Sequence, residues 1–334
     1  RSSHTATGIG YAVGCRAGSG DGDDDGMKYH HSFHAGNFAD VHKHVALLAL
    51  LRALQRKNKG FLYLETHAGA GAYDLVDPST HQGAEARGGI SALTAAAEPA
   101  AAELREYLAA VAAWRAAAGQ PRGYPGSAVL AAQSLRAQDR CVCCELQSAE
   151  HRALRQSLRG FHRVRTACED GYRRLAASLP ARERRALVLI DPPYESAAAE
   201  IEQALAAVHA ALERMANTVI ALWYPLKDER WLTAWQRRVE RELGAPAAAL
   251  ELWLYPRDGR VALNGSGLLI VNPPYQIEQR ARYWQHELLE RLQPGDRDGE
   301  RGSAARGTGF GASPGAGSAV RTLVAERPVR HAGA

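Results

Sequence analysis

The alternation of strand-like and helix-like segments constrains the fold of this chain most strongly. Between about residues 140 and 243, short apolar segments such as "RALVLIDPP" take turns with segments such as "AAAEIEQALAAVHAALER", whose apolar residues follow helical spacing. Regular alternation of this kind predicts an α/β fold, with a mostly parallel sheet covered by helices on both faces. With 334 residues, of which 46% are hydrophobic, the chain is long enough to bury such a core.

After this region the pattern changes. The apolar segments "ALELWLYP" and "GLLIVNPP" lie too close together for a helical crossover, so they predict an antiparallel hairpin late in the sheet. Earlier in the chain, Ala-rich sequence from about residue 88 to residue 120 predicts helices. We therefore expect a seven-stranded, mostly parallel sheet that ends in a hairpin.

The two ends of the chain differ in composition from its middle. Residues 1–26 are rich in Gly, Ser and Asp, and we expect a disordered extension upstream of a start at Met27. We expect one domain over residues 27–292 and a mobile Gly/Arg-rich loop over 293–317. The β-prone residues 318–326 predict an edge strand, with a wholly disordered tail as the alternative.

Charge and cysteine content indicate the kind of partner and the compartment. The net charge is +5 and the sequence pI is about 9.0, which favours a polyanionic partner such as nucleic acid. Three of the five cysteines lie in the strand-like segment "RCVCCEL", where alternation sends Cys141 and Cys143 to one face and Cys144 to the other, which favours buried residues in a reducing cytoplasm. No apolar run could cross a bilayer. We expect a cytoplasmic monomer with no membrane attachment and no obligate protein partner. A metal site is not expected, because the histidines near residue 30 have no acidic or Cys partners at ligand spacing.

The strongest chemical signal is "LVLIDPPYES", in which Asp-Pro-Pro-Tyr ends an apolar segment. Two prolines cannot continue a sheet ladder, so the tetrapeptide should end its strand and expose a backbone carbonyl. Asp191 adds a charged acceptor and Tyr194 an aromatic face, which together suit a flat ligand with an amino group, such as a nucleobase. Taken alone, the motif is equally compatible with an ordinary turn after a strand.

The position of this motif in the chain distinguishes the two interpretations. Polar or small residues also end the three preceding strands, at Glu65 with the loop Gly69–Gly71, at Glu145 and at Asp170. Ligands of open α/β sheets bind beyond the carboxyl ends of the strands, so these residues and Asp191 should share one crevice. Glu145 is placed to accept hydrogen bonds from ribose hydroxyl groups.

A second tetrapeptide, Asn272 to Tyr275, nearly repeats the first. It ends a strand of the late hairpin, and an antiparallel strand ends at the opposite edge of the sheet. We therefore predict that Asn272 terminates a strand and that Asp191 does the chemistry.

Several motifs together resemble a known family. The segments "YHHSFHAGNFADVHKH", "FLYLETHAGAGAY", "YPGS", "EDGY" and "LVLIDPPYE" resemble, in order and spacing, the RlmJ-type 23S ribosomal RNA adenine-N6 methyltransferases. The resemblance covers roughly Met27 to Glu290. It implies a Rossmann-like class I fold that uses S-adenosyl-L-methionine, a small helical subdomain inserted at about residues 74–123, and adenine 2030 of 23S ribosomal RNA as the target.

The resemblance also implies roles for individual residues. Near the target base it places Tyr29, His31 and Lys43, and it implies cofactor contacts from His44, His67, Ser127, Glu145, Asp170, Gly171 and Asp191. In the reaction, the Asp191 carboxylate and the Pro192 carbonyl would accept the two N6 hydrogens, with Tyr194 against the face of the base. We expect free or incompletely assembled ribosomal RNA as the substrate. A DNA adenine-N6 methyltransferase and a non-catalytic RNA-binding or ribosome-assembly protein are the alternatives.

Overall fold

The computed structural model describes residues 35–75, 85–194, 197–256, 263–292 and 315–325. The larger sheet contains β1 (Leu62–Glu65), β4 (Arg140–Cys144), β5 (Val164–Ala167), β6 (Ala186–Ile190), β7 (Val219–Leu226), β8 (Ala247–Trp253), β9 (Gly265–Val271) and β10 (Gly317–Val324). These eight strands lie in the order β5-β4-β1-β6-β7-β9-β8-β10. From β5 to β7 neighbouring strands pair in parallel, whereas β9, β8 and β10 add on in antiparallel pairs.

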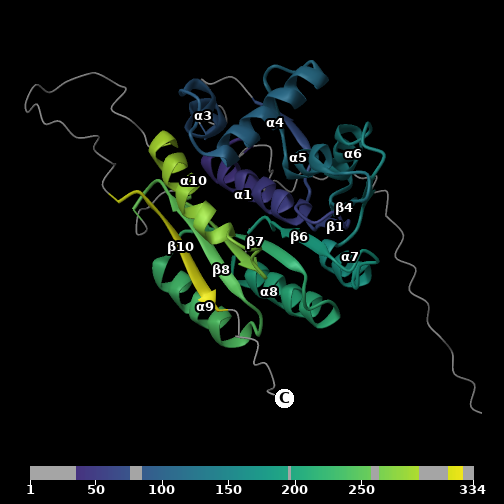
Figure 1. Cartoon of the computed structure of the whole chain (residues 1–334), viewed down its shortest axis with the longest axis vertical. Coiled ribbons are helices and arrows are strands. Elements are labelled where there is room, and N and C mark those ends of the chain that lie inside the picture. The colour runs from purple at the N-terminus through teal and green to yellow at the C-terminus, as the bar shows by residue number, and fades with distance from the viewer. Residues whose placement is uncertain (1–34, 76–84, 195–196, 257–262, 293–314, 326–334) are drawn as a thin grey trace, which may run out of the picture.

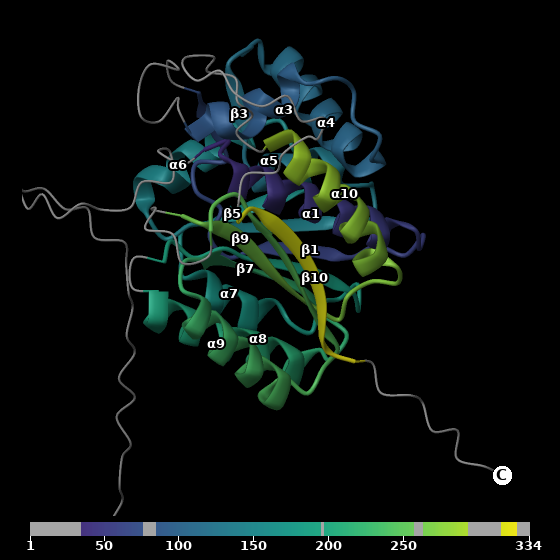
Figure 2. The same cartoon turned by 90° about the vertical axis from the view of Figure 1, so that its left-hand side faces the viewer.

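Helices cover both faces of the sheet. Figures 1 and 2 show α1 (Phe38–Gln55), α4 (Ala102–Ala118), α5 (Ser127–Ser134) and α10 (Ile277–Leu292) on one side, and α7 (Gly171–Ser178), α8 (Ala197–Arg214) and α9 (Glu229–Glu242) on the other. The core is accordingly split by the sheet into two clusters of buried side chains. The alternating sequence pattern predicted this Rossmann-like α/β arrangement correctly.

Smaller elements lie between β1 and β4 along the chain. They are the antiparallel pair β2 (Ala72–Asp74) and β3 (Gly123–Pro125), a π-helical turn (Arg87–Ser91), α3 (Ala92–Ala95) and the helices α4 and α5. Helix α6 (Ser148–Ser157) follows β4. The expected helical insertion at about residues 74–123 falls in this region, of which residues 76–84 lie outside the described part.

Helix α1 begins at an Asn cap and runs through the core. The side chain of Asn37 accepts a hydrogen bond from the amide of Asp40, at 2.9 Å, which satisfies one of the free amides of the first turn. The helix is buried on nearly all sides, including the apolar run of seven residues from Val45 to Leu51. Four polar side chains in its first half, Asp40, His42, Lys43 and His44, are buried with them. Burying charged groups is costly even when they are paired. The concentration of such groups on this helix therefore indicates a functional site.

The sheet has one strand more than the seven that we expected from the central part of the sequence. The additional strand is β10, which pairs with β8 at the edge of the sheet. It begins at Gly317, one residue before the β-prone segment 318–326 in which an edge strand was predicted. The expected extension at 1–26 and most of the expected loop at 293–317 lie outside the described residues. Within the described ranges, the model has no helix that is both long and apolar enough to span a bilayer.

Candidate active site

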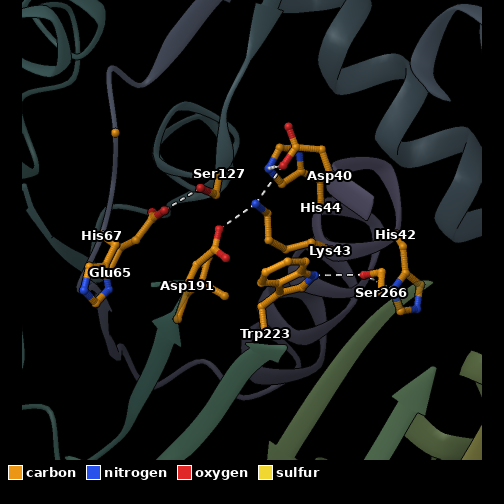
Figure 3. Close-up of polar contacts among 12 residues, drawn as sticks. Asp40, His42, Lys43, His44, Glu65, His67, Ser127, Asp191, Trp223 and Ser266 are labelled. Carbon is orange, nitrogen blue, oxygen red and sulfur yellow. Dashed lines mark hydrogen bonds and ion pairs between the residues drawn. The ribbon is translucent and has the colours of Figure 1, made fainter. Parts of the chain in front are cut away.

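The carboxyl ends of four adjacent parallel strands carry the predicted site residues. Glu65 ends β1, Glu145 follows β4, Asp170 lies three residues after β5, and Asp191 follows β6 directly. Because β5, β4, β1 and β6 are neighbours in the sheet, these carboxylates lie along one edge of it. Figure 3 shows two of them, Glu65 and Asp191, on the side of the sheet where Lys43 of α1 reaches Asp191.

Lys43 is the centre of a buried charge cluster. Its Nζ lies 2.6 Å from Oδ2 of Asp191 and 2.7 Å from Oδ1 of Asp40, and all three side chains are less than a tenth exposed. Burial opposes the charge of Lys43, but the carboxylates of Asp191 and Asp40 outweigh it and raise its pKa above the usual range. The lysine is therefore a permanent cation that fixes the Asp191 carboxylate against α1.

Glu65 is a second buried acid in the crevice. Its carboxylate accepts a hydrogen bond from Tyr63 Oη, at 2.8 Å, and another from Ser127 Oγ. Burial raises the pKa of Glu65 to about 7, although both hydroxyl groups act in the opposite direction. The predicted cofactor residue Ser127 thus contacts Glu65, an acid to which the sequence analysis assigned no role.

The loop after β1 is held by Glu145. Its Oε2 accepts the amide of Gly69, at 3.0 Å, and its Oε1 accepts the amide of Gln147, at 2.8 Å. Gly69 and Gly71 both have positive φ, which lets the chain turn tightly between β1 and β2. Gly69 and Ala70 are partly exposed, so the backbone of this part of the loop is open to close approach by a ligand, whereas Gly71 packs against α6.

Asp170 and Gly171 form the start of α7. Oδ1 of Asp170 caps the helix by accepting the amides of Tyr172 and Arg173, whereas its Oδ2 has no hydrogen bond to any described residue. A methyl group on Gly171 would lie 2.1 Å from the carbonyl oxygen of Thr66, so only glycine lets α7 approach β1 this closely.

Two predicted histidines lie at different depths. His67 follows β1, contacts Thr66 Oγ1 through Nδ1 at 2.8 Å, and packs edge-on against Tyr172. Burial lowers the pKa of His67 to about 4, although Asp191 and Asp170 oppose that shift. His44 is almost fully buried on α1 and makes a 2.9 Å hydrogen bond with the hydroxyl of Tyr124. His67 therefore lies at the crevice, whereas His44 supports the floor beneath it.

Tyr194 and Trp223 form an aromatic pair beside Asp191. Tyr194 is buried with positive φ, and its hydroxyl donates to the backbone carbonyl of Trp223. The two rings are tilted, with centroids 5.4 Å apart. Trp223 is only half-buried, and its ring lies next to Lys43 and Asp191 in Figure 3. The more open aromatic surface at the crevice thus belongs to Trp223, which the sequence analysis did not select.

A buried network holds the indole of Trp223. Its Nε1 donates to Oγ of Ser266, which lies 2.9 Å from Nδ1 of His42. The amide nitrogen of Gln285 donates to the carbonyl of Glu251 and lies 3.1 Å from Nε2 of His42. Because that nitrogen can only donate, Nε2 of His42 accepts and Nδ1 carries the proton. Burial lowers the pKa of His42 to about 3, so the imidazole is neutral.

Asn272 lies away from the crevice, as predicted. It ends β9, whose last residue Val271 is in register with Ile220 near the start of β7. Its side-chain amide donates to the carbonyls of Ala216 and Thr218, each at 2.8 Å. These contacts give the second tetrapeptide a structural role at the opposite edge of the sheet.

Three predicted site residues remain, of which two lie outside the described part of the chain. Tyr29 and His31 lie outside the described residues, and Pro192 is buried directly after Asp191. Within the described residues there is no group of three His, Cys, Asp or Glu side chains arranged to hold a metal ion.

Comparison with known proteins identifies the family. The family model described as "Ribosomal RNA large subunit methyltransferase D, RlmJ" matches residues 58–302. The chain belongs to this family. A protein named ribosomal RNA large subunit methyltransferase J from Haemophilus influenzae is 33% identical over 272 residues, which cover 80% of this chain and 95% of that protein. A protein of the same name from Escherichia coli is 35% identical over 266 residues, covering 79% of this chain and 94% of the relative.

A solved structure supports the fold of the RlmJ family chain. A crystal structure of a protein from Legionella pneumophila aligns with a TM-score of 0.72 at 30% sequence identity. The alignment covers 86% of this chain and 98% of that protein. The similarity therefore extends over the whole α/β domain and is not limited to the sheet.

S-adenosyl-L-methionine is the cofactor of this methyltransferase family, and the residues at the crevice fit it. Ribose hydroxyl groups need acceptors, and Glu145 together with the second oxygen of Asp170 supplies them. A sulfonium cation is favoured beside a carboxylate, and Asp191 supplies one at the carboxyl end of β6. The turn at Gly69 and Gly71 allows the backbone to approach the cofactor closely.

Proposed function

We propose that this chain methylates N6 of an adenine in 23S ribosomal RNA, at position 2030 by the resemblance of its motifs. The observation that carries the proposal is the Asp191 carboxylate, which follows β6 and is held in the crevice by the buried ammonium group of Lys43. The names of the two curated relatives support ribosomal RNA as the substrate. Action on ribosomal RNA places the protein in the cytoplasm, and we expect it to act as a monomer.

Asp191 and Pro192 are assigned to the reacting amine. The lone pair of adenine N6 is delocalised into the ring, so the amine is a poor nucleophile until its hydrogens are held out of the ring plane. Lys43 pairs with Oδ2 of Asp191, so we assign Oδ1 and the carbonyl of Pro192 as the acceptors for the two hydrogens. This geometry favours a more tetrahedral nitrogen whose lone pair can attack.

Proton loss follows methylation, because the methylated nitrogen is strongly acidic. S-adenosyl-L-methionine supplies the electrophilic methyl group when it is bound. Asp191 is the nearest assigned acceptor for the proton, and its position in the crevice lets it pass that proton to water. Much of the rate comes from holding the amine in line for attack, which the ion pair with Lys43 supports by fixing the carboxylate.

The aromatic wall beside Asp191 is assigned to the adenine ring. An enzyme that modifies a base takes it out of its stack and holds it against apolar or aromatic groups. The tilted pair of Tyr194 and Trp223 offers such a surface on the side of β7. From the resemblance, the target base is assigned Tyr29, His31 and Lys43 as neighbours. The cofactor is assigned His44, His67, Ser127, Glu145, Asp170 and Gly171.

Mass mapping of ribosomal RNA modifications tests the proposal. We expect one N6-methyladenine in 23S ribosomal RNA to disappear when the protein is removed and to return when it is supplied again. In vitro, protein-free 23S ribosomal RNA should be methylated faster than mature ribosomes or duplex DNA, since an exposed base is easier to extrude. Faster methylation of duplex DNA would replace this function with DNA methylation. RNA binding without any methyl transfer would make the protein non-catalytic.

A further inference from the structure

An arginine-lined hollow lies outside the active site. It has a volume of about 340 Å³ and is lined by the side chains of Arg140, Arg165, Arg174 and Arg182 together with parts of α7 and the connection to β6. Arg140 begins β4, Arg165 lies on the edge strand β5, and Arg174 lies on α7. Four guanidinium groups thus come from four separate segments and surround one space, which we call the arginine pocket.

The pocket keeps a positive charge after its internal ion pairs are counted. Arg140 binds Glu183 in a two-pronged contact, at 3.0 and 3.2 Å, and Arg182 binds the same carboxylate at 2.9 Å. Arg174 pairs with Glu169. Four arginines against two carboxylates leave a net charge of +2, since 4 − 2 = 2. This local excess is large for a chain whose total charge is +5.

Arg165 is the member of the pocket that is available to a ligand. It is exposed, and no described residue forms a hydrogen bond or ion pair with it. The pairs with Glu183 and Glu169 use only some of the five N–H donors of each other guanidinium group. Arginine donors in a fixed fork match the oxygens of a phosphate group, and a hollow of this size accommodates one.

The pocket and the active site are joined by α7. This helix starts at Asp170 and Gly171 in the crevice, and its last residues, Ala177 and Ser178, line the pocket. An eight-residue helix is about 12 Å long. The pocket lies at the amino ends of β4 and β6, so a strand of RNA whose target base occupies the crevice has to run along α7, from the carboxyl to the amino side of the sheet, before its backbone reaches the arginines.

We propose that the arginine pocket binds a backbone phosphate of the RNA substrate that flanks the target adenine. The proposal rests on the function proposed above. Phosphate contacts position a nucleic acid without reading its sequence, so the pocket should contribute affinity and register but leave the choice of base to the crevice. It should also make binding depend on salt, because each neutralised phosphate releases counterions.

Arg165→Ala and Arg165→Lys in the full chain test this assignment. We expect Arg165→Ala to weaken binding of a 23S ribosomal RNA fragment about tenfold at low salt, measured by fluorescence anisotropy. The slope of log affinity against log salt should fall in magnitude by about 0.7 to 0.9, the share of one phosphate contact. Arg165→Lys should restore most of the slope, because a lysine keeps the charge. The kcat at saturating RNA and the Kd of S-adenosyl-L-methionine should not change.

Arg237→Ala is the matched control, because Arg237 is also an exposed arginine, on α9, without a bonded partner among the described residues. Its affinity and salt slope should equal those of the unmodified chain. The proposal would be overturned if the slope of log affinity against log salt were the same for Arg165→Ala and the unmodified chain. Weaker binding of S-adenosyl-L-methionine by Arg165→Ala would also overturn it. Inorganic phosphate that binds the pocket without competing with RNA would assign it to a small anion instead. These results concern RNA binding alone, whereas failure of the proposed function would appear as absent methyl transfer by the unmodified chain.

Discussion

Asp191 shares the ammonium group of Lys43 with Asp40, so the reacting carboxylate belongs to a three-residue charge cluster. Both contacts are shorter than 3 Å and buried, which restricts all three side chains to one arrangement. A buried cluster of this kind is costly to form but strongly fixed once its partners are in place. The cluster fixes the position of the Asp191 carboxylate at the end of β6.

Asp191→Asn should lower kcat by about 10²- to 10⁴-fold, because it removes the charged acceptor but keeps the shape of the side chain. The fold should persist, since Lys43 retains its contact with Asp40. Single-turnover methyl transfer to a 23S ribosomal RNA fragment measures the effect, and circular dichroism checks the fold. Retained turnover in Asp191→Asn would contradict the assignment of the reacting carboxylate.

Asn272→Ala is the matched change in the second tetrapeptide. It removes two hydrogen bonds to Ala216 and Thr218 and places alanine at positive φ, so we expect about 1–3 kcal/mol of destabilisation. The kcat should be nearly normal at a temperature where the variant is folded. A loss of turnover as large as that of Asp191→Asn would exchange the roles of the two tetrapeptides.

Glu65 gives stability a pH dependence of predictable sign. Burial raises its pKa to about 7, so between its ordinary value of 4.5 and 7 the folded chain binds more protons here than the unfolded chain. Its contribution therefore favours folding at low pH and is lost as the pH rises towards 7. In Glu65→Gln this contribution is absent. From pH 5 to pH 8 the unmodified chain should therefore lose a few kcal/mol of unfolding free energy that Glu65→Gln does not lose. The variant becomes the more stable of the two, relative to their order at pH 5, by that amount.

Urea unfolding at several pH values measures that difference. Other titrating groups, including His42 and His67, affect both chains equally and cancel in the comparison. A difference that stays constant from pH 5 to pH 8 would show that Glu65 has an ordinary pKa in the folded protein.

Among the elements, α7 depends on one residue for its place in the fold. A side chain at Gly171 would collide with the backbone of Thr66, which cannot move without disturbing β1. Gly171→Ala should therefore destabilise the chain by about 1–3 kcal/mol and weaken the binding of S-adenosyl-L-methionine, because Asp170 moves with the helix. Calorimetry gives both quantities. Gly160→Ala is the control, since a methyl group there meets no atom within 4 Å, and it should leave stability and binding unchanged.

The elements were largely predictable from the sequence, and the side-chain contacts were not. Strand ends at Glu145 and Asp191 are visible as local changes from apolar to polar sequence. The partnership of Lys43 with Asp191 joins segments that lie 148 positions apart, and no local pattern encodes how α1 packs on β6. Trp223 was missed because it lies inside a strand, where an aromatic residue is ordinarily part of the core.

The exposure of the Tyr194 side chain could not be predicted from the sequence either. Its place after two prolines suggested an aromatic face that is open to a ligand. In the structure this residue has positive φ, its side chain is only 7% exposed, and its hydroxyl donates to the carbonyl of Trp223, so most of the ring is covered by the protein itself. Backbone conformation at a single position decides which face a side chain meets, and composition does not reveal it.

At the scale of the whole molecule, the sheet is completed by a strand from near the end of the chain. Arg321 on β10 forms an ion pair with Glu251 on β8, and Tyr224 and Gln236 also donate to this fully buried carboxylate. A charged group without a neighbouring cation is costly in such a position. The ion pair therefore adds a buried side-chain contact to the ladder that joins β10 to β8.

Arg321→Met should destabilise the chain by roughly 1–3 kcal/mol, because it leaves the buried carboxylate without its cation. In the double variant Arg321→Met/Glu251→Gln, the loss should be smaller than the sum of the two single losses. Urea unfolding of the four chains gives the coupling energy. Strictly additive losses would mean that the ion pair does not hold β10 in place.

The pairing of β10 with β8 also bears on how the protein behaves at high concentration. β8 reads "AAALELW", an apolar and fully extended stretch, and without β10 its outer row of N–H and C=O groups would face water. Such an edge is a template for a strand from another molecule, and chains that exchange strands in this way can grow into polymers. By supplying the last strand from its own C-terminal region, each molecule blocks the position that a neighbour would otherwise occupy. We therefore expect β10 to lower the tendency to self-assemble, because the edge that it presents, "GSAVRTLV", is more polar than the "AAALELW" edge that it covers.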